Sequence, residues 1–176
     1  MHNARDLLTQ YAAYHRDQRN IVTHFVGVPM IVFSLGVLLA RAMVQINGYP
    51  VTLAAVLFAL TAAWYVTRGP VLGLATSALV GALLLLGHQV AGGSVGSWLA
   101  WGISFFVVGW IVQFLGHYYE GRKPAFIDDL AGLLVGPMFI VAEWLFMLGW
   151  NKPLHEAIEA KVGPTHLRDL AHPDPA

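Results

Sequence analysis

The stretch FVGVPMIVFSLGVLLARAMVQI, residues 25–46, decides the fold class. It contains one charged residue, Arg41, near its end. A helix that crosses a bilayer needs about 20 predominantly apolar residues, and this stretch supplies them. It therefore predicts a transmembrane helix.

Four more apolar stretches follow along the chain. They span residues 51–67, 71–91, 98–116 and 130–150. Turn-forming Gly, Pro and Asn residues separate the first three from one another and from the opening stretch. The last stretch is interrupted by Gly136-Pro137 and carries Glu143. Short connections imply antiparallel neighbours. We therefore expect an all-α, polytopic membrane helical bundle with four transmembrane helices plus a fifth broken or re-entrant apolar helix. We expect residues 1–24 to form a cytoplasmic N-terminal segment, 25–150 the bundle, and 151–176 a polar C-terminal tail that is loose from about Gly163.

The composition supports a membrane protein. Apolar residues make up 57% of the chain, charged residues 11%, and the mean hydropathy is +0.60. A soluble domain has about 25% charged residues, so these charges could not cover a water-exposed surface. The net charge of zero gives no general attraction to nucleic acid. The absence of cysteine excludes disulfides, iron–sulfur clusters and thiolate metal sites, and the polar first 20 residues predict no cleavable signal peptide.

The basic residues predict the orientation. Most of them fall on the side of the N-terminus, and the two opposite loops carry none. Cytoplasmic loops are enriched in Lys and Arg, so the N-terminus and the segment after the fourth helix are expected to be cytoplasmic. The membrane would be the inner membrane of a bacterium or the endoplasmic reticulum of a eukaryote.

Alternation of the helices brings the informative histidines to one membrane face. His24 begins the first expected helix and His117 ends the fourth, whereas His88 falls on the opposite side. His15 lies nine residues before His24, so the two could share a metal only if the chain bends between them. Glu120 lies three residues after His117, on the same helix face. Three imidazoles with a nearby carboxylate suit Fe, Zn, Mn or Ni.

Each of these residues can also be explained by a structural role that involves no metal or substrate. A histidine at the membrane interface is often only a hydrogen-bonding residue. Asp17 or Asn20 can cap the N-terminus of a helix and so supply the bend. Arg122 and Lys123, just after the fourth helix, are either topogenic charges or partners of a substrate carboxylate.

Two blocks of the chain carry a resemblance to a known family. The strings YHRDQRNIVTHFVGVPMIVFS, from Tyr14, and WIVQFLGHYYEGRKPAFIDDLAGLLVGPMFIVAEWLFMLG, ending at Gly149, resemble the Fe(II)-dependent 2-hydroxy fatty acid dioxygenases. The characterised fungal member of that family acts in phytosphingosine breakdown in the endoplasmic reticulum. The resemblance implies α-oxidation, in which O2 converts a long-chain 2-hydroxy fatty acid into the acid one carbon shorter.

The resemblance also implies roles for particular residues. Fe(II) would be held by His15, His24 and His117, with Glu120 as a further catalytic residue. Arg122, Lys123 and Asn20 are expected to contact the substrate. The fungal pattern spaces the acid four residues after the histidine, whereas Glu120 follows His117 by three residues here; this departure bears on a direct bond from Glu120 to the metal.

Two other classes of protein fit the same features. One is another metal-dependent membrane lipid enzyme, a hydrolase or a hydroxylase, although the long histidine-rich sets of di-iron hydroxylases are missing. The other is a non-enzymatic small membrane protein for transport or assembly, with polar residues in mid-membrane; only Glu143 fits that pattern. The expected partners are the fatty acid and the bilayer, with oligomers possible.

Overall fold

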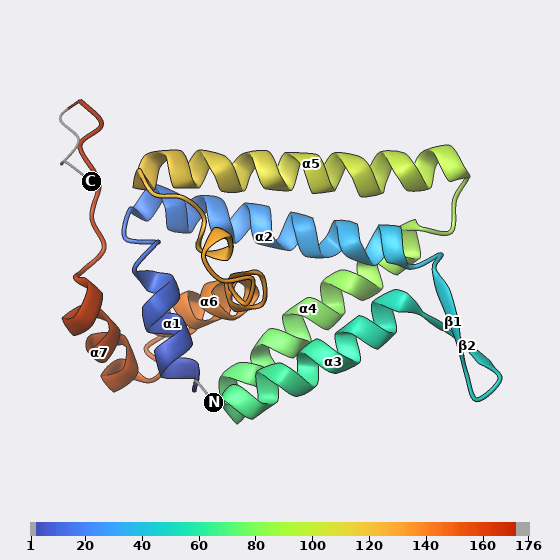
Figure 1. Ribbon diagram of the computed structural model, residues 1–176, viewed down its shortest axis with the longest axis horizontal. Coiled ribbons are helices and arrows are strands. Elements are labelled where there is room, and N and C mark those ends of the chain that lie inside the picture. The colour runs from blue at the N-terminus through green and yellow to red at the C-terminus, as the bar shows by residue number, and fades with distance from the viewer. Residues whose placement is uncertain (1–2, 172–176) are drawn as a thin grey trace. The chain divides into compact units, whose positions relative to one another are not determined.

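The computed structural model describes residues 3–171, which are mostly helical (Figure 1). The helices, in chain order, are α1 (Ala4–Ala12), α2 (Gln18–Leu39), α3 (Leu53–Arg68), α4 (Pro70–Val90), α5 (Val95–Glu120), the short 3-10 helix η1 (Ala125–Ile127), α6 (Gly132–Met147) and α7 (Lys152–Val162). The chain forms two compact units. The end unit consists of the chain up to Val26 and from Val112 onward, and the middle unit is Gly27–Ile111.

The all-α membrane bundle is confirmed, but the number of spans differs from the expectation. Three helices, α2, α4 and α5, are long and apolar enough to cross a membrane. The second expected span is α3, which has 16 residues. At 1.5 Å per residue it reaches about 24 Å, short of the ~30 Å hydrocarbon core.

The first span ends earlier than expected, because a β-hairpin follows it. Helix α2 stops at Leu39, and strands β1 (Met43–Ile46) and β2 (Tyr49–Thr52) pair antiparallel, with Val44 opposite Val51. The turn residues Asn47 and Gly48 have φ angles of 51° and 82°. Asn-Gly is the preferred sequence of a two-residue hairpin turn with positive φ angles, so this signal overrides the apolar character of residues 43–46.

The fifth apolar stretch is broken at a different place from the one expected. Helix α6 continues through Pro137, and the chain instead bends by 116° between α6 and α7. Gly149 and Asn151, in that connection, have φ angles of 85° and 48°. Together, α6 and α7 form either a broken span or a re-entrant pair.

Small residues allow close helix packing in the middle unit. A Cβ atom on Gly36 of α2 would lie 2.8 Å from the backbone of Leu84 on α4, and one on Gly87 would lie 2.6 Å from the carbonyl oxygen of Phe33. Membrane helices associate through such close contacts because lipid gives no hydrophobic driving force between them. The glycines therefore fix α2 against α4.

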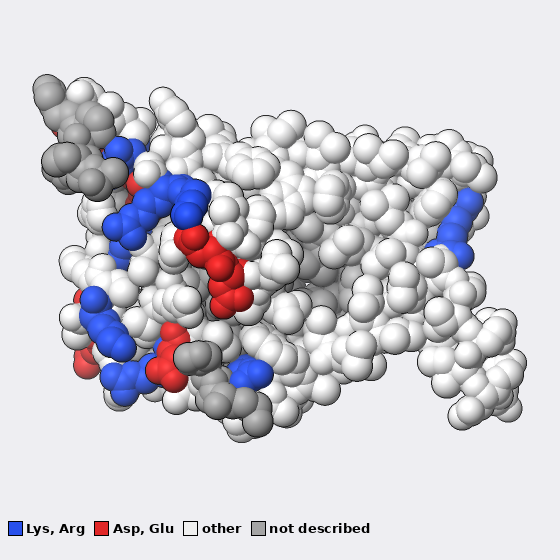
Figure 2. All heavy atoms as spheres, viewed as in Figure 1, with Lys and Arg blue, Asp and Glu red and all other residues white. Residues whose placement is uncertain are grey.

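The end unit has a core of its own. Helix α1 packs against α6 and α7. Leu8 of α1 and Met138 and Ile140 of α6 are fully buried there, and the rings of Tyr11 and Phe139 lie 5.1 Å apart. Figure 2 shows that most charged side chains on this face belong to the end unit. The only Asp, Glu, Lys or Arg residues in the sequence of the middle unit are Arg41 and Arg68.

Candidate metal centre

His15 lies in the bend between α1 and α2, where it is fully buried. Its Nδ1 is 2.8 Å from the carbonyl oxygen of Tyr11, and the Tyr11 ring stacks on the imidazole with centroids 4.2 Å apart. A carbonyl oxygen only accepts, so Nδ1 carries the proton and donates it. The tautomer of His15 is therefore fixed with Nε2 unprotonated.

His24 has the same arrangement on the second turn of α2. Its Nδ1 donates to the carbonyl oxygen of Asn20 at 2.8 Å, which leaves its Nε2 unprotonated too. The two Nε2 atoms of His15 and His24 face each other at 3.0 Å. Two lone pairs at this distance repel each other unless a proton or a cation lies between them. A histidine that binds a metal typically donates its other ring N–H to a carbonyl, as both do here.

His117, near the C-terminal end of α5, completes the group. Its ring centroid lies 5.0 Å from that of His15 and 5.2 Å from that of His24. Its Nδ1 is buried and has no hydrogen-bond partner within residues 3–171. One ring nitrogen from each of the three histidines lies within 4.8 Å of the others. The three side chains can therefore hold one metal ion, and all-nitrogen ligation suits a borderline divalent ion such as Fe²⁺ or Zn²⁺.

The surroundings keep His15 neutral. Burial, followed by the neighbouring imidazoles of His24 and His117, holds the pKa of His15 well below its ordinary value. A neutral imidazole has a free lone pair and binds a cation, whereas an imidazolium does not. His15 is therefore in the form that can bind a metal at neutral pH.

Glu120 holds the backbone next to His15. One carboxylate oxygen accepts from the backbone N–H of Arg16, and the other from the backbone N–H of Asp17, both at 2.8 Å. The second oxygen also accepts from the amide Nδ2 of Asn20 at 3.0 Å. Among the described residues the metal-binding group includes no carboxylate. The structure thus places Glu120 as a support of the bend that carries His15.

Asp17 caps α2 and gives the chain its bend. Its Oδ1 accepts from the backbone N–H of Arg19 at 2.8 Å, and its Oδ2 pairs with the Arg19 guanidinium at 2.7 Å. Burial raises the pKa of the Asp17 carboxyl, but the hydrogen bonds from Arg19 and from the backbone of Arg168 outweigh it and lower the pKa overall. The carboxylate is therefore ionised at neutral pH, and it accepts from a free N–H group in the first turn of α2.

The C-terminal segment that follows α7 is bound to this bend, contrary to the expected loose tail. The backbone N–H of His166 donates to Arg16 and that of Gln18 donates to His166, both at 2.9 Å. The backbone N–H of Arg168 donates to Asp17 Oδ2 at 2.9 Å. We call residues 163–168 the strap. Expected tail residues 172–176 lie outside the described residues.

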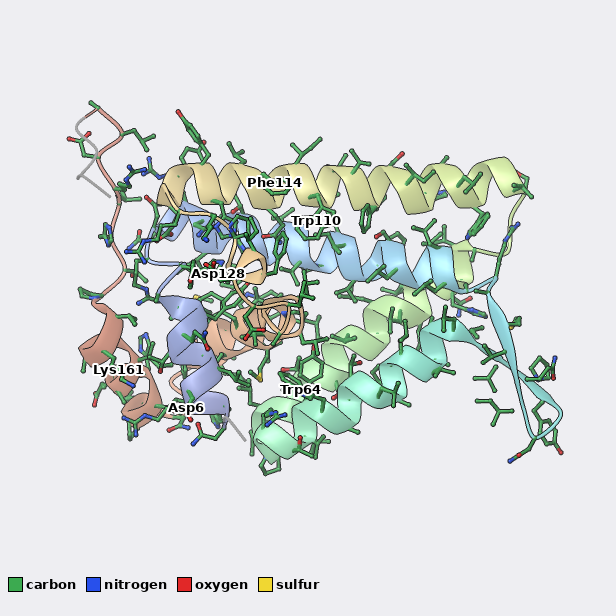
Figure 3. The ribbon with its side chains drawn as sticks, in the orientation of Figure 1. Asp6, Trp64, Trp110, Phe114, Asp128 and Lys161 are labelled. Carbon is green, nitrogen blue, oxygen red and sulfur yellow. The ribbon has the colours of Figure 1, made fainter. Side chains whose placement is uncertain are left out.

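The expected substrate contacts Arg122 and Lys123 lie on the exposed segment after α5. One N–H of Arg122 donates to the carbonyl oxygen of Ala13 at 3.0 Å. Lys123 pairs with Asp128 at 2.6 Å, and the Tyr14 hydroxyl donates to the same carboxylate at 2.9 Å. Asp128 is labelled in Figure 3. The third expected contact, Asn20, is buried, and its Nδ2 donates to Tyr14 and Glu120.

Other residues around the centre were not expected from the sequence. Nothing in the sequence next to Tyr11 indicates that its ring covers a histidine. The strap has the composition of a disordered tail, so its order was not expected either. His88, expected apart from the cluster, lies in the middle unit beside Phe58 and Leu84. Only the spacing of the N-terminal polar residues could have indicated that this region is folded.

Comparison with known proteins defines the class. A buried three-histidine centre at the end of apolar helices is typical of a metal-dependent membrane enzyme. A family model described as "2-hydroxy-palmitic acid dioxygenase Mpo1-like" matches residues 1–148. The 2-hydroxy-palmitic acid dioxygenase MPO1 of Saccharomyces cerevisiae is 35% identical over 158 residues, covering 88% of this chain and 87% of the yeast protein.

The chain therefore belongs to the Mpo1-like family. It is a membrane-embedded member of a family of dioxygenases, as the two histidine-containing blocks predict. No solved structure matches the chain.

Proposed function

We propose that this protein is an Fe(II)-dependent 2-hydroxy fatty acid dioxygenase, which uses O2 to convert a long-chain 2-hydroxy fatty acid into the acid one carbon shorter. The observation that carries the proposal is the pair of unprotonated Nε2 atoms of His15 and His24, 3.0 Å apart and buried. This pair needs a cation, and it occurs in a chain similar to a 2-hydroxy-palmitic acid dioxygenase over most of its length.

The reaction requires no second reductant. Oxidation of R–CH(OH)–COOH by one O2 gives R–COOH, CO2 and H2O, with all atoms and electrons balanced. Bound Fe(II) would supply open coordination positions for oxygen chemistry and act as a Lewis acid on the hydroxy acid. The proposed ligands are His15, His24 and His117, each held on a different structural element.

The remaining residues position these ligands and the substrate. The Glu120 carboxylate fixes the backbone after His15 through its two hydrogen bonds, and the Tyr11 ring covers the His15 imidazole from water. Arg122 uses one N–H on Ala13 and has four further N–H donors, which makes it the better candidate for the acid's carboxylate. Lys123 would have to break its ion pair with Asp128 before it could bind the acid's carboxylate.

The membrane setting fits a long-chain acid. Each buried methylene contributes about 0.8 kcal/mol, so most of the binding energy of such a substrate resides in a tail that also prefers lipid. We propose that the tail lies between helices and enters sideways from the bilayer. Shortening the tail would then weaken binding without changing the reaction at C1 and C2.

The decisive experiment is turnover by the purified protein. Protein loaded with Fe(II) under nitrogen is given 2-hydroxypalmitic acid, and the products are measured by mass spectrometry in air and under nitrogen. The expected product is the C15 acid, formed only in air, while palmitic acid is inert because it lacks the second oxygen. A protein that turns over no 2-hydroxy acid, or does so equally well without O2, is not this dioxygenase.

We also propose that the N-terminus and residues 116–129 face the cytoplasm. Support comes from the charge distribution: the loops of residues 47–50 and 92–97 carry no basic residue, whereas the N-terminal segment and the segment after α5 carry Arg5, Arg16, Arg19, Arg122 and Lys123. Cysteines placed at Asn3 and Lys123 should react only with reagents that reach the cytoplasm, and one at Ser94 only from the other side. The reverse labelling pattern would overturn the orientation.

A further inference from the structure

Gln113 on α5 is buried without hydrogen-bond partners. Its side chain is 5% exposed, and neither Nε2 nor Oε1 has a partner within residues 3–171. A buried amide that makes no hydrogen bond destabilises the fold, because it gives up its hydrogen bonds to water and gains none. Polar groups left in this state are rare and call for an explanation. An apolar side chain of similar length would pack there at lower cost.

The buried face of α5 in the end unit places Gln113 beside the metal centre. This face consists of Gln113, Gly116, His117 and Glu120. Gln113 precedes His117 by four residues, so the two side chains lie on the same face, about one 5.4 Å turn apart. The next residue, Phe114, labelled in Figure 3, is 51% exposed and lies on a different face.

The contacts between α2 and α5 fix the level of Gln113. Glu120 contacts the start of α2, through the backbone of Asp17. One turn earlier on α5, a Cβ on Gly116 would lie 2.5 Å from Oδ1 of Asn20, which is one turn later on α2. The two helices are therefore antiparallel here, and the next turn of α5 brings Gln113 to the level of His24. Gln113 thus lies deeper along the helices than His117, on the side from which an acyl chain would extend.

We propose that the Gln113 amide binds the 2-hydroxyl group of the fatty acid and so selects 2-hydroxy acids over unsubstituted ones. The proposal rests on the proposed function. Oε1 accepts the hydroxyl proton, and Nε2–H donates to an oxygen of the adjacent carboxylate. A neutral amide suits this position, because it can be buried without a counter-ion and offers one acceptor next to two donors.

This arrangement explains selectivity as well as affinity. A site built to hydrogen-bond a substrate hydroxyl rejects the analogue that lacks it, because its own polar group is then left unpaired. With palmitic acid bound, Oε1 of Gln113 would remain unpartnered. The acid's carboxylate lies toward Arg122 and the aqueous end of the site.

The test compares wild type with Gln113→Met, which keeps the length and removes the hydrogen bonds. Binding of 2-hydroxypalmitic and palmitic acids to the iron-loaded proteins is measured under nitrogen, where no turnover occurs, together with the iron content. We expect Gln113→Met to retain its iron and to lose its preference for the hydroxy acid over palmitic acid by a factor of about 10 or more, because only the hydroxy acid loses the bond to Oε1. Leu115→Met, on the exposed face of the same turn, is the matched control and should behave as wild type.

The outcomes separate the two proposals. If wild type shortens 2-hydroxypalmitic acid but Gln113→Met keeps the full preference, the Gln113 inference fails alone, and the amide holds water or is structural. If wild type does not turn over the acid, the proposed function fails and takes the inference with it. Should Gln113→Met not retain iron, Gln113→Asn takes its place. Its amide is one methylene too short, so its preference should also fall, and an unchanged preference would overturn the inference.

Discussion

The two units of this protein treat buried polar groups in opposite ways. In the middle unit the buried polar side chains among the described residues are Ser34, Thr76 and Ser77, and each donates to a carbonyl three or four residues earlier on its own helix. In the end unit, the buried Glu120 accepts from residues about 100 positions away along the chain. The middle unit satisfies these buried polar side chains within single helices, whereas the end unit combines local hydrogen bonds, such as that of His15 to Tyr11, with the long-range ones of Glu120.

The charges follow the same division. Residues 27–111 contain no acidic residue and only Arg41 and Arg68 as basic ones. A segment with this composition is stable in lipid because each helix satisfies its own backbone. The end unit instead builds a polar interior around three histidines. This contrast supports the proposal that the middle unit anchors the protein in the membrane and that the end unit carries the chemistry.

The largest effect that would sharpen this contrast is expected from the histidines. Changing His15, His24 or His117 to Ala should abolish stoichiometric metal binding, because a site with two of three ligands keeps little affinity. His88→Ala, in the middle unit, should leave metal content unchanged. Elemental analysis of the purified variants measures the effect. Full metal occupancy in two of the three cluster variants would contradict the assignment of the site.

A pair of near-isosteric variants compares tertiary with local hydrogen bonds. Both carboxylate oxygens of Glu120 accept from N–H groups, and in Glu120→Gln an NH2 group replaces one of these oxygens. Because a donor then faces a donor, we expect the free energy of unfolding to fall by about 2–3 kcal/mol. Metal affinity should also fall, by about 10–100-fold, as for other residues that support a ligand. Thr76→Val removes only a hydrogen bond within α4, so the free energy of unfolding should fall by less than about 1 kcal/mol. Denaturant unfolding in detergent measures both, and equal losses would remove the contrast.

The strap should have an intermediate effect. A chain that ends at Pro164 loses the bonds of His166 and Arg168 to the bend, so the backbone N–H of Gln18 should exchange faster with solvent. Metal affinity should fall by less than about 10-fold, because Glu120 still holds the bend. Hydrogen exchange and metal titration measure these changes. A chain that ends at Ala171 keeps every one of these bonds and is the control; if both truncations behave alike, the strap has no role in the site.

The smallest effect is expected at the exposed ion pair of Asp128. The Lys123 ammonium, and then the Tyr14 hydroxyl, lower the pKa of the Asp128 carboxyl below its ordinary value near 4. A carboxyl with a lowered pKa stabilises the fold above its ordinary pKa and loses that contribution as the pH falls through the lowered value. Wild type should therefore lose stability in this acidic range more steeply than Asp128→Asn. Parallel thermal unfolding curves for the two proteins between pH 5 and 2 would contradict the pairing.

Much of this protein follows from its sequence. Apolar runs such as residues 25–39 determine the membrane class, because no soluble surface can be built from them. His24 and His117 were expected at one membrane face because four alternating helices, an even number of crossings, were expected between them. Asp17 or Asn20 was expected as a helix cap because either side chain can accept from the free N–H groups that begin a helix, and the structure gives this role to Asp17. These are local or topological consequences of residue type and spacing.

Tertiary structure decided the rest. The approach of His117 to His15 and His24 depends on the return of α5 to the bend, and the partners of Glu120 lie on a segment far away in sequence. The strap is polar and apolar residues are sparse in it, so its order comes from hydrogen bonds to Arg16 and Gln18 rather than from any periodic pattern. Sequence patterns report what each segment prefers to bury. Which donor meets which acceptor is decided only when segments far apart along the chain come together.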